Sequence, residues 1–452
     1  MAHRYVKWIG DRILPRFARQ YVDRIEQSPI GSRLAYGVFW SVAGATIGRL
    51  LGLASTILIA RFLGKEEFGS LGIIYSTIAM YQLFAGFGLG MTGLKYVAEF
   101  KAKDPIRAGR IIALSQIIAV STGVVVAAIL AIFAEQIASK ALNAPHLANL
   151  IRISSLTILA GAINGAQTGA LAGFEAFKSQ ARISLIIGIM TFPITVGGVY
   201  FAGIAGVIWG TVISMVLNAV LNNISLRREM KRHGISSTYL GCFKEAKVLW
   251  SFSMPVLLGG MLVTPINWVC SALLVNQEGG YAEMGVFSAA NQWFGALLFL
   301  PQTLGQVVMP LLSERFGISD RKSSIKILSF SLMVNALMLF PIIIVLCLLS
   351  PFIMASYGDS YREGWATLVI VVITAGLVGI QDPVGHVLGA SGRMWVGFSM
   401  NLGWAIVFVI SALLLVRWGA IGLASARLAS YCFHATWVFA WTFYFFRKEQ
   451  AS

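Results

Sequence analysis

The sequence has little negative charge, little cysteine and few ionisable residues of any kind. Of its 452 residues only 19 are Asp or Glu, against 35 Lys or Arg, and there are four cysteines far apart along the chain. Isolated cysteines provide neither a disulfide framework nor the ligand spacing of a zinc site. Charged residues make up 12% of the chain and hydrophobic residues 57%, more apolar surface than a water-soluble core can bury. We therefore expect lipid to be the solvent, with no large soluble domain.

Two functional classes are disfavoured at this point. The formal charge of +16 does not indicate nucleic-acid binding, because the basic residues flank hydrophobic runs and form no single patch with interleaved aromatic residues. An enzyme is disfavoured because the sequence shows no paired carboxylates in a long loop, no glycine-rich phosphate loop before a helix and no His/Cys ligand set. We expect a protein that is not an enzyme and that uses no metal or organic cofactor.

Apolar runs recur along the whole chain. A helix needs about 20 apolar residues to cross the hydrocarbon core of a bilayer, and helices are expected because backbone polar groups in lipid must be paired within the segment. The sequence predicts an all-α polytopic membrane protein of about twelve transmembrane helices, at residues 35–60, 68–95, 110–134, 148–172, 180–202, 204–226, 248–275, 284–311, 325–350, 365–390, 395–416 and 420–445.

The basic residues predict the orientation of these helices. Lys and Arg in short loops are retained on the cytoplasmic side, and here they gather before the first run and after the even-numbered runs. Both termini are therefore expected in the cytoplasm. The opposite side has few basic residues: Arg61, Lys65, Lys140, Arg152, Arg362 and Arg417.

An internal repeat relates the two halves of the chain. Residues 68–76 align with 281–289 at an offset of 213, and Gly203 and Gly206 fall on Gly419 and Gly422 at an offset of 216. A duplicated unit of six helices explains this order. Because six is even, both copies enter the membrane from the same side and are related by an axis along the membrane normal.

The repeat predicts a two-lobed bundle with a central cleft, which is the usual architecture of alternating-access transporters. Its predicted parts are a basic amphipathic segment (1–33), an N-terminal six-helix lobe (34–226), a basic cytoplasmic linker (227–247), a C-terminal six-helix lobe (248–446) and a cytoplasmic tail (447–452). In the first segment apolar residues spaced by four favour a helix on the anionic inner leaflet. A loosely ordered extension is the alternative, and Pro15 favours a break.

Two arginines lie inside predicted spans. An ionisable residue there costs about 2.5–3.5 kcal/mol on insertion scales, so it usually faces a water-filled cavity or a partner. Arg49 and Arg427 both fall in the outer half of the membrane, one in each lobe. Their planar guanidiniums could face each other across the cleft and bind phosphate oxygens. Alternatively, each arginine bonds backbone carbonyls or extends to the interface.

A carboxylate and a histidine share one helix face in the tenth span. Asp382 and His386 are four residues apart, beside Pro383, and could take up and release a proton. A structural intrahelical hydrogen bond is the alternative. Glu99, at a helix end facing the cytoplasm, is a further candidate for proton coupling, or else a solvated carboxylate beside basic residues.

The seventh span is the candidate gate helix. Prolines and glycines interrupt it, and prolines kink helices and free carbonyl groups. Plain packing without a gating role is the alternative. The residues concerned are Pro255, Gly259, Gly260 and Pro265.

One stretch of the sequence resembles a known family. The run Ile59–Gly69 (IARFLGKEEFG), preceded by Gly48-Arg49-Leu50 and followed by Tyr96-Val97-Ala98-Glu99, is similar to the opening of the polysaccharide transport family, the Wzx-type O-antigen flippases. These belong to the multidrug, oligosaccharidyl-lipid and polysaccharide exporter superfamily. The resemblance covers essentially the whole chain in length and repeat pattern.

The resemblance implies a flippase of the bacterial cytoplasmic membrane. Such a protein moves an undecaprenyl-pyrophosphate-linked oligosaccharide, an O-antigen, capsule or exopolysaccharide repeat unit, from the inner to the outer leaflet through a cationic cleft, driven by a proton or sodium gradient. The implied partners are this lipid-linked substrate, membrane lipids, and glycan polymerase or chain-length proteins. Of the arginines typical of the family, only Arg49 can be placed securely in this sequence.

Other functions remain open. A multidrug and toxin extrusion antiporter shares the duplicated twelve-helix fold, but its common acidic residue in the first span is missing, where Arg49 stands instead. Lipid II flippases usually have two additional helices. An oligosaccharide polymerase or ligase would be an enzyme with a long external loop, which the sequence lacks.

Overall fold

The computed structural model describes residues 29–86, 88–248, 261–317 and 320–451, which are helical with no strand among them. The long helices are α3 (Pro29–Gly86), α4 (Leu89–Phe100), α5 (Pro105–Gln136), α7 (Leu156–Gly173), α8 (Phe177–Arg232), α11 (Val263–Val275), α12 (Gly280–Gly317), α13 (Arg321–Ser356), α14 (Trp365–Ala390), α15 (Met394–Leu415) and α16 (Gly419–Ala451). Short helices connect them: η1 (Ile137–Ala141), η2 (Pro145–Leu147), α6 (Ala148–Ser154), η3 (Cys242–Glu245), α9 (Ala246–Val248), η5 (Asp359–Gly364) and η6 (Val416–Trp418).

The predicted spans coincide with these helices. Two long helices contain two spans each, separated by a bend at Gly64 in α3 and at Ala202 and Gly203 in α8. The second span continues into α4, and α11 is the described part of the seventh. Seven helical stretches of the described chain are long and apolar enough to cross a membrane, and three of them exceed 50 residues and hold two spans each. The prediction of an all-α multi-pass membrane protein is confirmed.

The two halves repeat the same backbone turn at the positions that the alignment predicted. Gly203 has φ 55° and ψ −140°, and Gly419, 216 residues later, has φ 66° and ψ −142°. Residues with a side chain rarely adopt this backbone conformation, so glycine is the residue that fits here. The internal repeat is therefore present in the fold as well as in the sequence.

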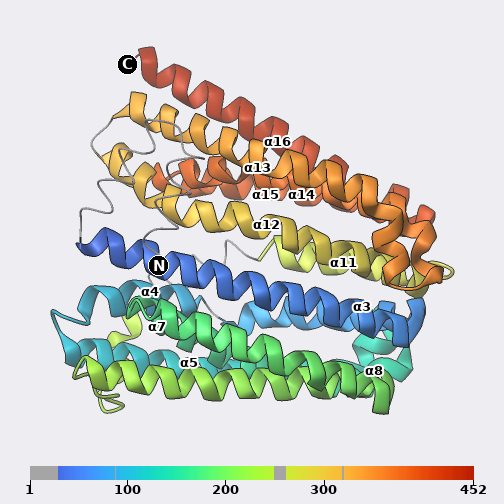
Figure 1. Cartoon of the computed structure of the whole chain (residues 1–452), viewed down its shortest axis with the longest axis horizontal. Helices are drawn as coiled ribbons and strands as arrows, with labels where there is room; N and C mark the ends of the chain where they lie inside the picture. The colour runs from blue at the N-terminus through green and yellow to red at the C-terminus, as the bar shows by residue number, and fades with distance from the viewer. Residues whose placement is uncertain (1–28, 87, 249–260, 318–319, 452) are drawn as a thin grey trace.

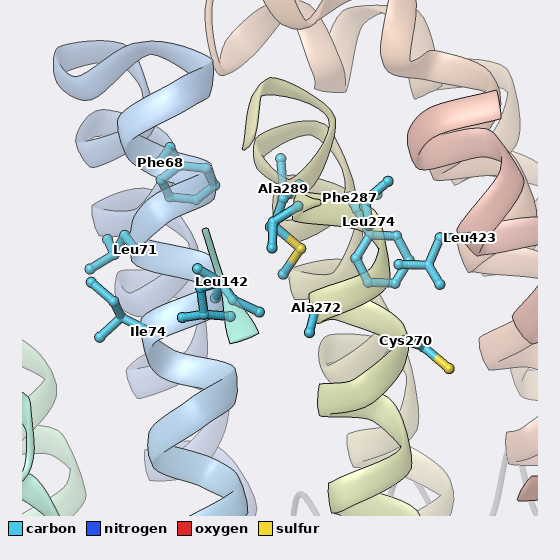
Figure 2. Packing of buried hydrophobic residues seen from close by; sticks show 14 of the residues in the cluster. Phe68, Leu71, Ile74, Leu142, Cys270, Ala272, Leu274, Phe287, Ala289 and Leu423 are labelled. Atoms are coloured by element: carbon cyan, nitrogen blue, oxygen red, sulfur yellow. The ribbon is translucent and has the colours of Figure 1, made fainter. Parts of the chain in front are cut away.

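The helices of the two halves form two groups (Figure 1). Helices α3 to α8 lie together on one side, α11 to α16 lie on the other, and α3 and α12 run side by side between the groups. Apolar side chains fill part of this junction: Phe68, Leu71 and Ile74 of α3 lie near residues of α11 and α12 such as Ala272 and Ala289 (Figure 2). Because lipid is as apolar as these side chains, close packing rather than burial from water stabilises the junction.

At one end of the bundle the two lobes touch through their glycines. A Cβ atom on Gly69 would overlap the carbonyl of Tyr281, and a Cβ atom on Gly285 would overlap the carbonyl of Lys65. Small residues permit such close backbone approach between membrane helices. Since 68–76 and 281–289 are the aligned segments, two helices related by the repeat cross each other here. We call this crossing, with Gly69, Gly72 and Gly285, the outer seam.

Hydrogen bonds between the lobes surround the outer seam. The Arg61 Nε donates to the carbonyl of Ser356 at 2.6 Å, and the Tyr361 hydroxyl donates to the carbonyl of Gly64 at 3.1 Å. On the other flank, the Tyr281 hydroxyl donates to the carbonyl of Leu142 at 2.7 Å. The distribution of basic residues predicts this end of the bundle to be periplasmic. The lobes are thus joined at the predicted outer end.

Some predictions fall outside the described residues. These are most of the basic segment 1–33 and three of the four gate residues, Pro255, Gly259 and Gly260. The fourth, Pro265, lies in the first turn of α11, where a missing backbone N–H disturbs no intrahelical hydrogen bond. Helix α8 continues to Arg232, so the linker predicted at 227–247 begins as helix.

Candidate functional site

Arg49 connects the two lobes in the middle of the bundle. Its Nη1 donates to the carbonyl of Gly295 at 2.9 Å, and its guanidinium carbon lies 4.3 Å from the ring centre of Phe299. Arg49 belongs to α3 and its two partners belong to α12, so the contact crosses from one half of the molecule to the other. The Arg49 side chain remains exposed.

Arg427 is held inside the C-terminal lobe. Its Nη1 donates to Asn291 Oδ1 at 2.6 Å, its guanidinium carbon lies 3.8 Å from the ring centre of Phe294, and only 7% of the residue is exposed. Its Nε is buried and has no hydrogen-bond partner among the described residues. Arg427 therefore contacts α12 from within the C-terminal lobe and does not face Arg49 directly.

The two arginines nevertheless converge on one helix. Arg427 contacts residues 291 and 294 of α12, and Arg49 contacts residues 295 and 299. These contacts are about four residues apart, or about 6 Å along the helix axis. Within the described part of the chain neither arginine forms a salt bridge with a carboxylate. Among the residues that the structure describes, the middle of the bundle thus contains two positive charges that form no ion pair.

The surface of α12 at this level is polar and accessible. Asn291, Gln292 and Gly295 are exposed, as is Arg49. Asn291 lies eleven residues inside α12, about 16 Å from the start of the helix. Amides and guanidiniums facing lipid at this depth would be costly. This face of α12 is therefore expected to border water between the lobes.

Asp382 and His386 also lie against α12, at a different level. His386 Nε2 is 3.2 Å from Asp382 Oδ2, and the two side chains are 26% and 28% exposed. A Cβ atom on Gly305 of α12 would overlap His386 and lie 3.1 Å from Asp382 Oδ2. Gly305 is fourteen residues beyond Asn291, about 21 Å along the helix. The pair is thus separated from the arginines but shares a helix with them.

The first lobe lacks this polar pair. There the equivalent crossing brings Gly90 and Gly93 of α4 against Gly169 and Ala170 of α7, and a Cβ atom on Gly93 would lie 2.9 Å from the Ala170 nitrogen. At the offset of 216 residues Ala170 corresponds to His386. A crossing that contains only small residues in the first copy therefore contains a titratable pair in the second.

Glu99 lies apart from these groups. It is exposed at the end of α4 and lines a cavity of about 380 Å³ with Tyr96, Phe100, Arg107, Lys244, Glu245 and Lys247. The cavity lies between the N-terminal lobe and the linker. The structure does not bring Glu99 to Asp382 and His386.

The sequence alone does not identify α12 as the helix that Arg49, Arg427 and the Asp382–His386 pair all contact. The contacted positions Asn291, Phe294, Gly295 and Phe299 follow the three- and four-residue spacing of one helix face. The polar pair Asn291 and Gln292 inside an apolar run is the signal that could have drawn attention to it.

Residues 58–365 match the protein family described as "Polysaccharide biosynthesis protein". The chain belongs to this family. The family resemblance predicted from residues 59–69 is therefore confirmed.

Two curated relatives of this family member have related names. The EPS I polysaccharide export inner membrane protein EpsE of Ralstonia nicotianae is 22% identical over 83% of this chain and 86% of its own. The succinoglycan biosynthesis transport protein ExoT of Rhizobium meliloti is 23% identical over 85% of this chain and 74% of its own. Both relatives are named as export or transport proteins.

Solved structures confirm the fold. An inward-facing multidrug resistance MATE family transporter of the MOP superfamily aligns with a TM-score of 0.73 at 12% identity, covering 92% of this chain and 99% of its own. The lipid II flippase MurJ in an inward closed conformation aligns with a TM-score of 0.67 at 15% identity, covering 88% of this chain and 86% of its own. This member of the polysaccharide biosynthesis protein family thus has the fold of a two-lobed membrane transporter.

Proposed function

We propose that this protein is a flippase that moves an undecaprenyl-pyrophosphate-linked oligosaccharide from the inner to the outer leaflet of the bacterial cytoplasmic membrane. Its family and its transporter fold support this proposal. The names of two relatives also support it: one is an EPS I polysaccharide export inner membrane protein, and the other is a succinoglycan biosynthesis transport protein. Both termini would lie in the cytoplasm, as the basic residues predict.

The observation that carries the proposal is the position of Arg49. Its exposed guanidinium lies between the lobes, uses one N–H for the carbonyl of Gly295, and has no salt bridge among the described residues. A guanidinium offers planar pairs of donors that match phosphate oxygens. A lipid-linked pyrophosphate supplies the missing negative charge. Arg49 is therefore the residue proposed to bind the pyrophosphate. Arg427 supports this site indirectly, by holding Asn291 in place.

The closed outer seam fits entry of the substrate from the cytoplasmic side. With the lobes joined at the predicted periplasmic end, a substrate enters between them from the cytoplasmic side and the inner leaflet. Opening the seam while the inner ends close releases it outward. This rocking of one lobe against the other is alternating access. Arg49 contacts α12 of the other lobe. A substrate bound to Arg49 would therefore change a contact that holds the two lobes together.

The pair Asp382 and His386 is the proposed site of proton coupling. A histidine can take up and release a proton, and a protonated imidazole forms an ion pair with the carboxylate 3.2 Å away. Because both side chains pack on Gly305 of α12, a change in their charge acts on the helix that Arg49 contacts. Sodium coupling is the competing possibility, and a sodium gradient without a proton gradient tests it.

The test is translocation of a fluorescent lipid-pyrophosphate saccharide by protein reconstituted in liposomes. Wild-type protein is expected to move the lipid between leaflets, and Arg49→Ala is expected to lose at least about tenfold in rate, or about 1.4 kcal/mol. The control is Arg417→Ala, which removes an exposed arginine far from Arg49 in the fold. Wild-type rates for Arg49→Ala would exclude the proposed role of Arg49.

A cationic fluorescent drug in the same liposomes separates this function from multidrug antiport. The proposal expects no drug transport, because two unpaired arginines repel a cation. Transport of the drug without transport of the lipid would contradict the proposed function and indicate multidrug antiport.

A further inference from the structure

The linker between the lobes forms a folded loop on the side of α5. After α8 ends at Arg232, the chain turns at Gly234 and Gly241, both with positive φ, and forms η3 and α9. In Figure 1 it lies at the left end of the molecule, beside α5 and α7 and away from α11 to α16. The proposed translocation between the lobes assigns no role to this loop, so its composition calls for a separate explanation.

Several contacts fasten the loop to α5. Arg107 Nε lies 3.0 Å from Glu245 Oε2, and the Arg107 guanidinium carbon lies 4.3 Å from the ring centre of Phe100. The carbonyl of Ser236 packs against Gly109, where a Cβ atom would overlap it. Cys242 is fully buried. The loop is thus a fixed part of the N-terminal lobe.

The Tyr239 side chain, in the middle of the loop, reaches along α5 toward the predicted membrane interior. Ser236 lies level with Gly109, but the Tyr239 hydroxyl lies 3.5 Å from Gln116 Oε1. Gln116 is seven residues further along α5, about 10 Å deeper, and inside the predicted third span. Glu245 lies at the level of Arg107. The Tyr239 side chain therefore reaches the level of the predicted third span.

The side chains at the tip of the loop are aromatic or aliphatic, and more than half of each is exposed. Tyr239 is 56% exposed, Leu240 89% and Phe243 62%. Surfaces of this kind mark contacts with a membrane or a partner. Since the Tyr239 hydroxyl lies beside α5 at the level of the predicted third span, the acyl chains of the inner leaflet are the surroundings that fit these side chains.

Two lysines follow this tip in the chain, and the side chain of Lys244 lies near Gly241. Lys244 and Lys247 line the cavity of about 380 Å³ together with the Arg107–Glu245 pair, Glu99 and two aromatic residues. Arg107 is neutralised by Glu245, and the two lysines have no salt bridge among the described residues. Basic pockets on the cytoplasmic side of membrane helices suit anionic headgroups.

We propose that the loop 233–248 is a binding site for an anionic phospholipid of the inner leaflet. Lys244 and Lys247 hold the phosphate of the headgroup at the mouth of the cavity, and Tyr239, Leu240 and Phe243 lie among its acyl chains. The bound lipid anchors the linker at the point where the chain passes from one lobe to the other. This site is independent of the proposed flippase activity.

The first test is lipid binding by the purified full-length protein, measured by native mass spectrometry. Phosphatidylglycerol is compared with phosphatidylcholine of the same acyl chains. The proposal expects a preference for phosphatidylglycerol that falls several-fold in the double variant Lys244→Gln, Lys247→Gln. The matched control is Lys178→Gln, Lys231→Gln, which removes two exposed cytoplasmic-end lysines outside the cavity. An equal loss in both double variants, or no preference in the wild type, would overturn the proposal.

A competition experiment separates a lipid from a free anion. Millimolar inorganic phosphate is expected to leave phosphatidylglycerol bound, because acyl-chain contacts supply part of the affinity. Displacement of the lipid by phosphate would show a site for soluble anions and overturn the lipid assignment.

The second test measures the depth of the loop in vesicles. Leu240→Cys, in a background with Cys347 and Cys432 replaced by Ser, carries a fluorophore. Because Leu240 is exposed, this change should not disturb folding. Nitroxide-labelled phospholipids are expected to quench the label more strongly than an aqueous nitroxide, and a label at Lys231→Cys should show the reverse. Stronger aqueous quenching at position 240 would overturn the proposal.

Discussion

Arg49 and Phe299 belong to different halves of the molecule, and the guanidinium carbon of one lies 4.3 Å from the ring centre of the other. A cation over an aromatic face contributes about 0.5–2 kcal/mol, depending on its desolvation. The same guanidinium also donates to the carbonyl of Gly295. Arg49 thus links the lobes and offers its remaining donors to a ligand.

The shape of the Arg49 side chain should matter as well as its charge. Arg49→Lys keeps the charge but loses the planar pair of donors, so translocation is expected to fall several-fold, a smaller loss than in Arg49→Ala. Phe299→Leu keeps an apolar side chain without the aromatic face and should cause a smaller loss. Translocation assays in liposomes measure both. A lysine variant with full activity would show that charge alone is sufficient.

Filling the outer seam should shift the protein toward an outward-open state. In Gly285→Val the new side chain collides with the carbonyl of Lys65, and overpacking of this kind typically costs about 1–3 kcal/mol. A cysteine at Gly295, where a Cβ atom has free space, should then react faster with a membrane-impermeant thiol reagent added outside. Gly165→Val, at another site with free space, is the control. Unchanged reactivity at position 295 would argue against the seam as a gate.

Arg427 should be needed for activity more than for stability. Burying a guanidinium without a carboxylate is costly, and replacing such a charge by an apolar residue is often neutral or stabilising. Arg427→Met is therefore expected to keep or raise Tm while reducing translocation several-fold. If Arg427 acts through Asn291, adding Asn291→Ala should reduce activity no further. A large drop in Tm would instead indicate a structural role.

Replacing Asp382 should uncouple translocation from the proton gradient. Asp382→Asn keeps the size of the side chain but removes the charge that pairs with His386. Gradient-driven translocation is expected to be lost, and exchange without a gradient to remain. Comparing the two modes in the same liposomes distinguishes coupling from substrate binding. Loss of both modes would place Asp382 in binding or folding.

Asp320 should stabilise the fold in a pH-dependent way. Its side chain accepts a hydrogen bond from the Ser323 backbone N–H at 3.1 Å at the start of α13. Hydrogen bonds from Ser323, with help from Arg315, lower the pKa of Asp320 below its ordinary value of 3.8. The stabilisation is present above that ordinary value and is lost as pH falls through the lowered one. Asp320→Ala should therefore lower Tm near neutral pH, with a difference that shrinks in acid. A constant difference would contradict this prediction.

The sequence by itself determined the helices and their duplication. Long apolar runs leave the backbone no alternative to helix in lipid, so the twelve spans and the turn at Gly203 and Gly419 could be read from residue order. The candidate residues Arg49, Arg427, Asp382 and His386 were found the same way, because a charge in an apolar run is conspicuous.

Only the tertiary structure decided what these residues contact. Arg49 and Gly295 are 246 residues apart, and no local pattern encodes which helices of two similar lobes become neighbours. That choice depends on small residues such as Gly69 and Gly285, whose absence of a side chain permits close approach without specifying a partner. The convergence of both arginines and the Asp382–His386 pair on α12, and the contacts of the linker with α5, follow from that packing.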